Sequence, residues 1–153
     1  MAAIDARNDP YRAFNYEVDF GDKTSAGFSE VSGLVADGDH VDYREGTDRF
    51  NHVRRLPALR KYPNNLVLKR GYTKNINLWT MAQQTALGKT NRRDVIITLK
   101  DEEHNPVMRW KVMAAWVNKI EGPSLKASGN EVAMESVELC FESISVELVG
   151  GGA

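Results

Sequence analysis

Hydrophobic and polar residues alternate along most of this chain, and the alternation predicts strands with one buried face. The first example is a run in which Phe14, Tyr16, Val18 and Phe20 alternate with polar residues. Alternation or β-branched residues predict further extended segments at 28–31, 35–43, 65–69, 93–100, 107–114 and 132–148. In the last of these the apolar residues change from odd to even positions near Ser143, which indicates a bulge or a strand end.

Local signals add one helix and one hairpin to these strands. The predicted helix has Thr73 or Asn75 as its N-cap and Gly88 as its C′ residue. Its apolar face, at helical spacing, consists of Trp79, Ala82 and Ala86. Residues 101–106 (DEEHNP) are typical of a turn and should join the strands on either side into a hairpin. Together these elements predict a mainly β fold with one α-helix, an antiparallel β-barrel or two-sheet sandwich with the helix against one side.

The segment from Tyr43 to Pro63 does not fit this pattern, because it resembles neither a helix, a strand nor an ordinary turn. Unstructured connections longer than about 12 to 15 residues are uncommon in compact domains and usually are functional or disordered. This one lacks the composition of a disordered linker, because apolar and basic residues are interleaved. They are Tyr43, Phe50, Val53, Leu56, Leu59 and Tyr62 among Arg44, Arg49, Arg54, Arg55, Arg60 and Lys61. We interpret the segment as a protein contact surface, with a nucleic-acid patch or a solvated loop as alternatives.

Length and composition place the chain among globular proteins and narrow its partners. Its 153 residues suit a single domain spanning 1–153, and 42% of them are hydrophobic. A formal net charge of -1 argues against a protein that binds nucleic acid sequence-specifically. No apolar run approaches the roughly 18 residues of a membrane helix. The N-terminal residues also lack a signal-peptide core. We therefore expect no direct membrane insertion, and folding and assembly in a bacterial cytoplasm.

Motifs for catalysis or ligand binding are weak. Residues 88–90 (GKT) match the end of a phosphate-binding loop, but Gln83 occupies the position of its first glycine and the tripeptide follows the helix. Asp37, Asp39 and Asp42 have calcium-loop spacing without the required glycine, so we interpret them as a solvated turn. The histidines lie beside no recognisable nucleophile: His40, His52 and His104. We expect no enzymatic activity, no cofactor and no metal.

Cys140 is the single cysteine, so the chain can form no internal disulfide, and a zinc site is not expected. It lies in an apolar alternating run, where a free cysteine is usually buried. We therefore expect a buried, inert thiol.

Several short motifs, in their order and spacing, give the chain a family resemblance. They are DPYRAFNYEV, GFSEVSGL, VDYREG, LVLKRG, the Trp79 helix, RRDVIITLKDEEHNPVMRWKV, Trp116 and EGPSLKASGNEVAMESVEL. From about Asp9 to about Phe141 the chain resembles the tail tube protein of contractile phage tails and of phage-like extracellular injection systems. The resemblance implies a structural protein that forms hexameric rings, which stack into a hollow inner tube inside a contractile sheath.

The resemblance also implies partners and contact residues. Strands of neighbouring subunits would continue the sheet around the ring, and the connection from Tyr43 to Tyr62 would reach adjacent subunits and rings. The partners would be further copies, the sheath protein, baseplate and tube-cap proteins, and a tape-measure protein or cargo in the lumen. The expected contact residues are Tyr43, Arg44, Glu45, Phe50, Arg54, Arg55, Leu56, Leu59, Arg60 and Tyr62, with Gly129 and Asn130 as weaker candidates.

Two expectations describe how the long connection should behave. Its apolar residues should become buried only after neighbouring subunits arrive, and its arginines should find carboxylates on another subunit. The sequence leaves open whether residues 43–63 form an extended hairpin or an irregular loop before assembly. An N-terminal arm (1–10) and a flexible tail (150–153) complete the predicted organisation.

Other functions remain open at this point. The chain could be an adaptor or terminator that ends such a tube as a single ring. It could also be a monomeric β module whose long loop grips one ligand. The sequence does not separate a phage tail from an injection particle, and it does not give the lumen charge or the cargo.

Overall fold

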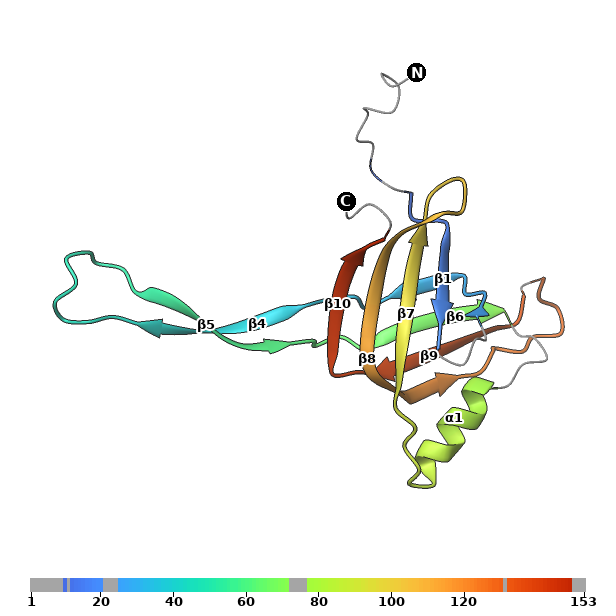
Figure 1. Cartoon of the computed structure of the whole chain (residues 1–153). Coiled ribbons are helices and arrows are strands. Elements are labelled where there is room, and N and C mark those ends of the chain that lie inside the picture. The colour runs from blue at the N-terminus through green and yellow to red at the C-terminus, as the bar shows by residue number, and fades with distance from the viewer. Residues whose placement is uncertain (1–9, 11, 21–24, 72–76, 131, 150–153) are drawn as a thin grey trace, which may run out of the picture.

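The computed structural model describes residues 10, 12–20, 25–71, 77–130 and 132–149, and this part of the chain contains ten strands and one helix (Figure 1). In chain order the elements are β1 (Tyr16–Asp19), β2 (Ser25–Ala26), β3 (Glu30–Ser32), β4 (Asp37–Tyr43), β5 (Arg54–Lys61), β6 (Leu66–Gly71), α1 (Asn77–Ala86), β7 (Arg93–Lys100), β8 (Pro106–Glu121), β9 (Met134–Cys140) and β10 (Ser143–Leu148). The predicted mainly β fold with one helix is confirmed. Most of the N-terminal arm 1–10, the N-cap candidates Thr73 and Asn75, and the tail 150–153 lie outside the described residues.

The strands of the body form two sheets that share the long strand β8. The first sheet has the order β2, β1, β7, β8, β10, and the second has the order β8, β9, β6, β3. Every neighbouring pair is antiparallel. Within the described ranges the pairing runs from β2 to β3 without joining these two ends. The structure therefore has the antiparallel sheets that the alternation predicts.

Strand β8 turns the corner between the two sheets at Ala114. This residue has a φ of 55°, in the left-handed region, and its N–H donates to Asp94 Oδ1 at 3.1 Å. Across the corner β9 ends at Cys140 and β10 begins at Ser143. The predicted strand 107–114 is therefore too short, because a bulge lets the strand bend and continue to Glu121. The predicted strand end near Ser143 is confirmed.

The core lies between the two sheets and consists mainly of aliphatic side chains. Leu66, Leu68, Val112 and Val137 are fully buried. Phe14 departs from the predicted pattern, because it precedes β1 and is 63% exposed. One buried ion pair joins the strands of the second sheet at its inner face, between Arg70 of β6 and Glu135 of β9.

Helix α1 packs against β8 through a face that differs from the predicted one. The buried residues are Leu78 and Met81, with Ala82 packed beside them, whereas Ala86 is exposed. The apolar stripe therefore begins one residue earlier than predicted. The predicted C′ glycine is confirmed, because Gly88 has a φ of 86° and the N–H of Lys89 donates to the Gln84 carbonyl at 2.9 Å.

The predicted hairpin of β7 and β8 is also confirmed. Its turn is organised by Asp101, whose Oδ1 accepts the backbone N–H groups of Glu103 and Asn105, both at 2.9 Å. His104 completes the turn with a φ of 64°. The acidic residues here hold a turn, as the sequence indicates.

Candidate functional site

The most distinctive feature of the molecule is a two-stranded hairpin that extends far from the body (Figure 1). We call residues 37–61 the projecting hairpin; it consists of β4, the tip loop 44–53 and β5. Its strands pair from Asp37 opposite Lys61 to Tyr43 opposite Arg54. The interpretation of 43–63 as neither strand nor helix is therefore wrong, because residues 54–61 form β5. The question left open by the sequence is answered in favour of an extended hairpin.

Strand β5 was missed because its sequence, RRLPALRK, shows no alternation of apolar and polar residues. Such alternation appears when one face of a strand is buried and the other is solvated. Here every residue of β4 and β5 is exposed, so neither face imposes a pattern. Pro57 is tolerated because a two-stranded ribbon consists of edge strands, and the pairing shifts by a bulge between Gly38 and His40.

The projecting hairpin continues the ribbon made by β3 and β6. Ser32 pairs with Val67 in the body, and pairing resumes at Asp37 opposite Lys61. We call the segments between, 33–36 and 62–65, the root. Gly33 is required there, because its φ is 97° and a Cβ would lie 2.1 Å from the carbonyl oxygen of Asn65.

Tyr62 of the root holds the hairpin to the body. Its hydroxyl donates to the Ile144 carbonyl at 3.4 Å, and its ring lies 5.9 Å from the ring of Phe141. Tyr62 was predicted to contact another subunit, and the structure places it half-buried against its own β10 side of the body. Its aromatic ring thus helps to fix the direction in which the hairpin leaves the body.

Large apolar side chains are exposed along the hairpin. Val41 and Leu56 are cross-strand neighbours, exposed by 53% and 45%, and Leu59 is 79% exposed. The bulge in the pairing sets two residues of β5 opposite Asp39, so Leu59 lies on the same face of the ribbon as Leu56. Solvent exposure of several large apolar residues on one element is typical of a surface that another protein covers.

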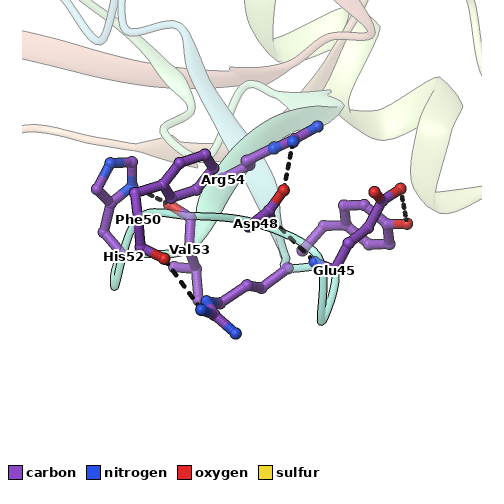
Figure 2. A network of polar contacts seen from close by, with 8 residues as sticks. Glu45, Asp48, Phe50, His52, Val53 and Arg54 are labelled. Atoms are coloured by element: carbon purple, nitrogen blue, oxygen red, sulfur yellow. Dashed lines mark hydrogen bonds and ion pairs between the residues drawn. The ribbon is translucent and has the colours of Figure 1, made fainter.

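The tip loop is ordered by a polar network centred on Asp48 (Figure 2). The Asp48 side chain is only 5% exposed. Its Oδ1 accepts Arg54 Nη2 at 2.7 Å, and its Oδ2 accepts the backbone N–H of Glu45 at 3.1 Å. The backbone N–H of Asp48 in turn donates to the Glu45 carbonyl at 3.1 Å. The tip is therefore a folded unit rather than a loose loop.

Aromatic and basic side chains stack beside this network. The rings of Phe50 and His52 are 4.3 Å apart and nearly parallel, and the Arg54 guanidinium lies 5.5 Å from the centre of the Phe50 ring (Figure 2). On the other side of the loop Arg44 Nη2 donates to the Phe50 carbonyl at 3.0 Å. Phe50 thus organises the tip instead of projecting freely into solvent.

Glu45 completes the network at the end of β4. Its Oε1 accepts the hydroxyl of Tyr43 at 2.8 Å, and this hydrogen bond raises the pKa of Tyr43. Asp48 was missed by the sequence analysis, although the turn composition of EGTD, residues 45–48, could have identified it.

Ion pairs within the hairpin involve two of its arginines. Arg54 is paired with Asp48, and Arg55 Nε lies 3.9 Å from Asp42 Oδ1 in the same hairpin. In the described part of the chain, Arg44, Arg49 and Arg60 form no ion pair. The expectation that the arginines find carboxylates on another subunit stays a prediction.

The acidic residues of β4 have a different place from the one predicted. They belong to a strand and not to a solvated turn: Asp37, Asp39 and Asp42. Lys61 Nζ lies 2.8 Å from Asp39 Oδ2, and this hydrogen bond raises the pKa of Lys61. Cross-strand attraction of this kind supports the register of a ribbon that has no core of its own.

Gly129 and Asn130 are not brought together with the projecting hairpin. They lie in the exposed connection between β8 and β9, on the opposite side of the body (Figure 1). The N–H of Gly129 donates to the Lys126 carbonyl at 3.0 Å, which closes a turn. The predicted contact residues thus fall on two separate surfaces.

Cys140 is half-buried, so the expectation of a buried thiol is wrong in degree. It is the last residue of β9, on the face opposite the core residues Val137 and Leu139. Its Sγ donates to Asn65 Oδ1 at 3.4 Å. Burial, and secondarily the charge of Glu138, raise the pKa of Cys140, which disfavours the reactive thiolate.

No group of three His, Cys, Asp or Glu residues in the described ranges could hold a metal ion. No helix in that part of the chain has the length and apolar character needed to cross a membrane.

Comparisons with known proteins connect this architecture to one family. A family model described as the T4-like virus tail tube protein gp19 matches residues 12–145. No curated protein matches the chain in sequence.

Several solved structures have the same fold as this chain. A chain from the structure of an extracellular contractile injection system, the PVC sheath-tube complex in its extended state, is similar at 22% identity with a TM-score of 0.84, covering 97% of this chain and 99% of that one. A chain from the anti-feeding prophage cap, the AFP tube terminating cap, is similar at 24% identity with a TM-score of 0.83, covering 94% and 95%. Hcp1 from Flavobacterium johnsoniae is similar at 14% identity with a TM-score of 0.56, covering 90% and 95%.

Proposed function

Because the chain belongs to the family of the T4-like virus tail tube protein gp19, and is therefore a tail tube protein, we propose that its copies form six-membered rings. The rings stack into the hollow inner tube of a contractile tail or injection particle. The role is structural and needs no catalytic group.

The observation that carries this proposal is the exposed apolar surface of the projecting hairpin. A monomer gains nothing from a folded hairpin that leaves Val41, Leu56 and Leu59 in water. Burial of such side chains contributes roughly 1.5 to 3 kcal/mol each. Contact of this face of the ribbon with a neighbouring subunit supplies this burial.

Unpaired sheet edges support closure into a ring. Strand β10 pairs with β8 on one side, and its apolar residues Val146 and Leu148 are 58% and 63% exposed. In the described part of the chain no strand covers its other side. Pairing of such edges between subunits continues the sheet around a ring and removes edges that invite uncontrolled association.

The predicted contact residues divide between ring and stacking contacts. Those of the hairpin are Tyr43, Arg44, Glu45, Phe50, Arg54, Arg55, Leu56, Leu59 and Arg60, and Tyr62 positions the root. Gly129 and Asn130 lie on the opposite side of the body and supply a second surface for the next subunit. A chain with contacts on two opposite sides can assemble into a closed ring, or into a stack that extends along an axis.

The remaining partners follow from a tube of this kind. The outer surface contacts a sheath protein, the ends contact baseplate and cap proteins, and the lumen holds a tape-measure protein or cargo. Assembly takes place in the bacterial cytoplasm, and the finished tube belongs to a virion or an extracellular injection particle. The fold shared with a chain of the PVC sheath-tube complex supports this setting.

Electron microscopy of the purified chain in negative stain tests the proposal. Tubes, or six-fold rings that stack as the concentration rises, are the expected result. Discrete single rings at every concentration would instead indicate a terminator. Particles of monomer size at high concentration, confirmed by light scattering, would overturn the proposal in favour of a monomeric binding module.

A further inference from the structure

The root of the projecting hairpin contains an open hollow of about 480 Å³. Its polar lining comes from Ser32, Asn64, Asn65 and Glu138, and the wall is completed by Gly33, Pro63 and Val67. The lining is built around the close approach of Gly33 to the Asn65 carbonyl. The close approach of these two backbone segments thus fixes the shape of the hollow, and it also directs the hairpin away from the body.

The hollow presents one carboxylate, Glu138, that forms a single long hydrogen bond within the described ranges. Glu138 Oε2 accepts a long hydrogen bond of 3.4 Å from Asn65 Nδ2. The cation opposite Glu138 in the β8–β9 register is Lys119, but its Nζ lies 2.7 Å from Glu121 Oε1. In the described part of the chain, Glu138 therefore has no ion-pair partner within 4 Å. An anionic group among amide and hydroxyl groups is suited to a guanidinium, which donates in a planar fork.

The tip of the hairpin offers that cation. Its two carboxylates are occupied within the tip, Glu45 by Tyr43 and Asp48 by Arg54. In contrast, Arg49 is exposed and forms no hydrogen bond or ion pair within the described ranges. Because the Asp48 network holds the loop in one conformation, the tip can present Arg49 with little further loss of conformational entropy.

Within one chain these two features cannot meet. Strand β5 has 8 residues, so the tip lies about 26 Å from the root at about 3.3 Å per residue. The tip of one copy and the root of another can meet, and this contact is heterologous, since a different surface contributes on each side. Heterologous contacts generate rings or open helical stacks, whereas pairing of two tips would place Arg49 of one copy against Arg49 of the other.

We propose that the hollow at the hairpin root receives the tip of the projecting hairpin of a second copy, with Arg49 of the tip pairing with Glu138. This contact rests on the proposed tube function and specifies which surfaces join. It makes the projecting hairpin a connector with an arginine at its tip and a carboxylate in the hollow at its root, so that each copy both inserts a tip and receives one.

A charge exchange tests the pairing. Arg49→Glu and Glu138→Arg, made singly, should each reduce the yield of sedimentable tubes at least about tenfold, because each places like charges together in a contact that excludes water. The double variant should recover most of the yield. Lys89→Glu, the same change of charge on the exposed loop after α1, should assemble normally. Melting curves of all four proteins check that the body remains folded.

A second measurement does not depend on the fold of the charge variants. In a Cys140→Ser background, a chain carrying Arg49→Cys is mixed with a chain carrying Asn64→Cys before assembly, and the tubes are oxidised. A disulfide-linked pair of the two chains is expected, and either chain alone should give no such product. The proposed contact would be overturned if the wild type forms tubes, no cross-link appears, and both single charge variants assemble normally. Wild-type protein that never assembles would instead contradict the tube function.

Discussion

The body and the projecting hairpin are both built from antiparallel strands, but the body buries its apolar residues and the hairpin exposes them. In the body Leu68 is fully buried, while in the hairpin Leu59 is 79% exposed. The body also buries its Arg70–Glu135 pair, whereas Arg55 and Asp42 of the hairpin lie in water. The difference shows that the body has a hydrophobic core of its own, and under the proposed function a partner covers the apolar residues of the hairpin.

The largest expected difference comes from one substitution made in both regions. Leu68→Ala should lower the free energy of unfolding by about 2 to 5 kcal/mol, because it leaves a cavity in the core. Leu59→Ala should change it by less than about 0.5 kcal/mol, because the side chain is already exposed. Chemical denaturation of the unassembled chains measures both. Equal losses would mean that the hairpin is part of the cooperative core.

A second difference concerns the glycine at the junction of the two regions. Gly33→Ala should destabilise the chain by about 3 kcal/mol, because it adds strain at a positive φ to a backbone clash. Gly88→Ala also has a positive φ, but no atom lies within 4 Å of its Cβ position. It should cost only about 1 kcal/mol, the strain of a residue with a Cβ in the left-handed region. Thermal melting compares the stability of the two variants. A lower melting temperature for Gly88→Ala than for Gly33→Ala would contradict the account of the root.

The tip should respond locally to the loss of Asp48. Asp48→Ala removes the acceptor of Arg54 and of the Glu45 N–H, so amide hydrogens of residues 45–53 should exchange at least about tenfold faster. Exchange in the core strands should not change. Asp42→Ala, which removes a carboxylate 3.9 Å from Arg55, is the matched control and should leave the tip protected. Unchanged exchange at the tip after Asp48→Ala would show that the network does not order it.

The smallest expected effect concerns the thiol beside the root. Burial and the Glu138 charge raise the pKa of Cys140, so its alkylation should be slow near neutral pH. The rate should increase with pH and level off above the ordinary pKa of a cysteine, because only the thiolate reacts. Glu138→Gln should shift this profile to lower pH, since it removes a negative charge. A profile unchanged by Glu138→Gln would contradict the contribution of that carboxylate.

The contrast between buried and exposed strands also explains how much of the fold could be predicted from the sequence. Strand β9 was recognised because alternate residues face the core, and strand β7 because it is rich in β-branched residues. Gly88 was recognised because a helix end needs a left-handed residue. The corner at Ala114 was not predicted, because alanine carries no local signal for a positive φ and the conformation depends on Asp94 of another strand.

The candidate site was predicted in position but not in structure. Interleaved apolar and basic residues identified 43–63 as unusual, yet periodicity could not reveal β5, because both of its faces are solvated. Asp48 was missed for a related reason: its role depends on Arg54, which the turn at the tip brings back beside it. The hollow at Glu138 joins the root to β9 and is not visible in any single stretch of sequence.

The central claim is that the projecting hairpin serves assembly and not the stability of the monomer. Sedimentation velocity and thermal melting of one variant, Val41→Ser, Leu56→Ser and Leu59→Ser combined, test it most directly. We predict a protein that melts within a few degrees of the unassembled wild-type chain and sediments as a monomer at concentrations where the wild type forms tubes. Tubes in normal yield from this variant would contradict the account.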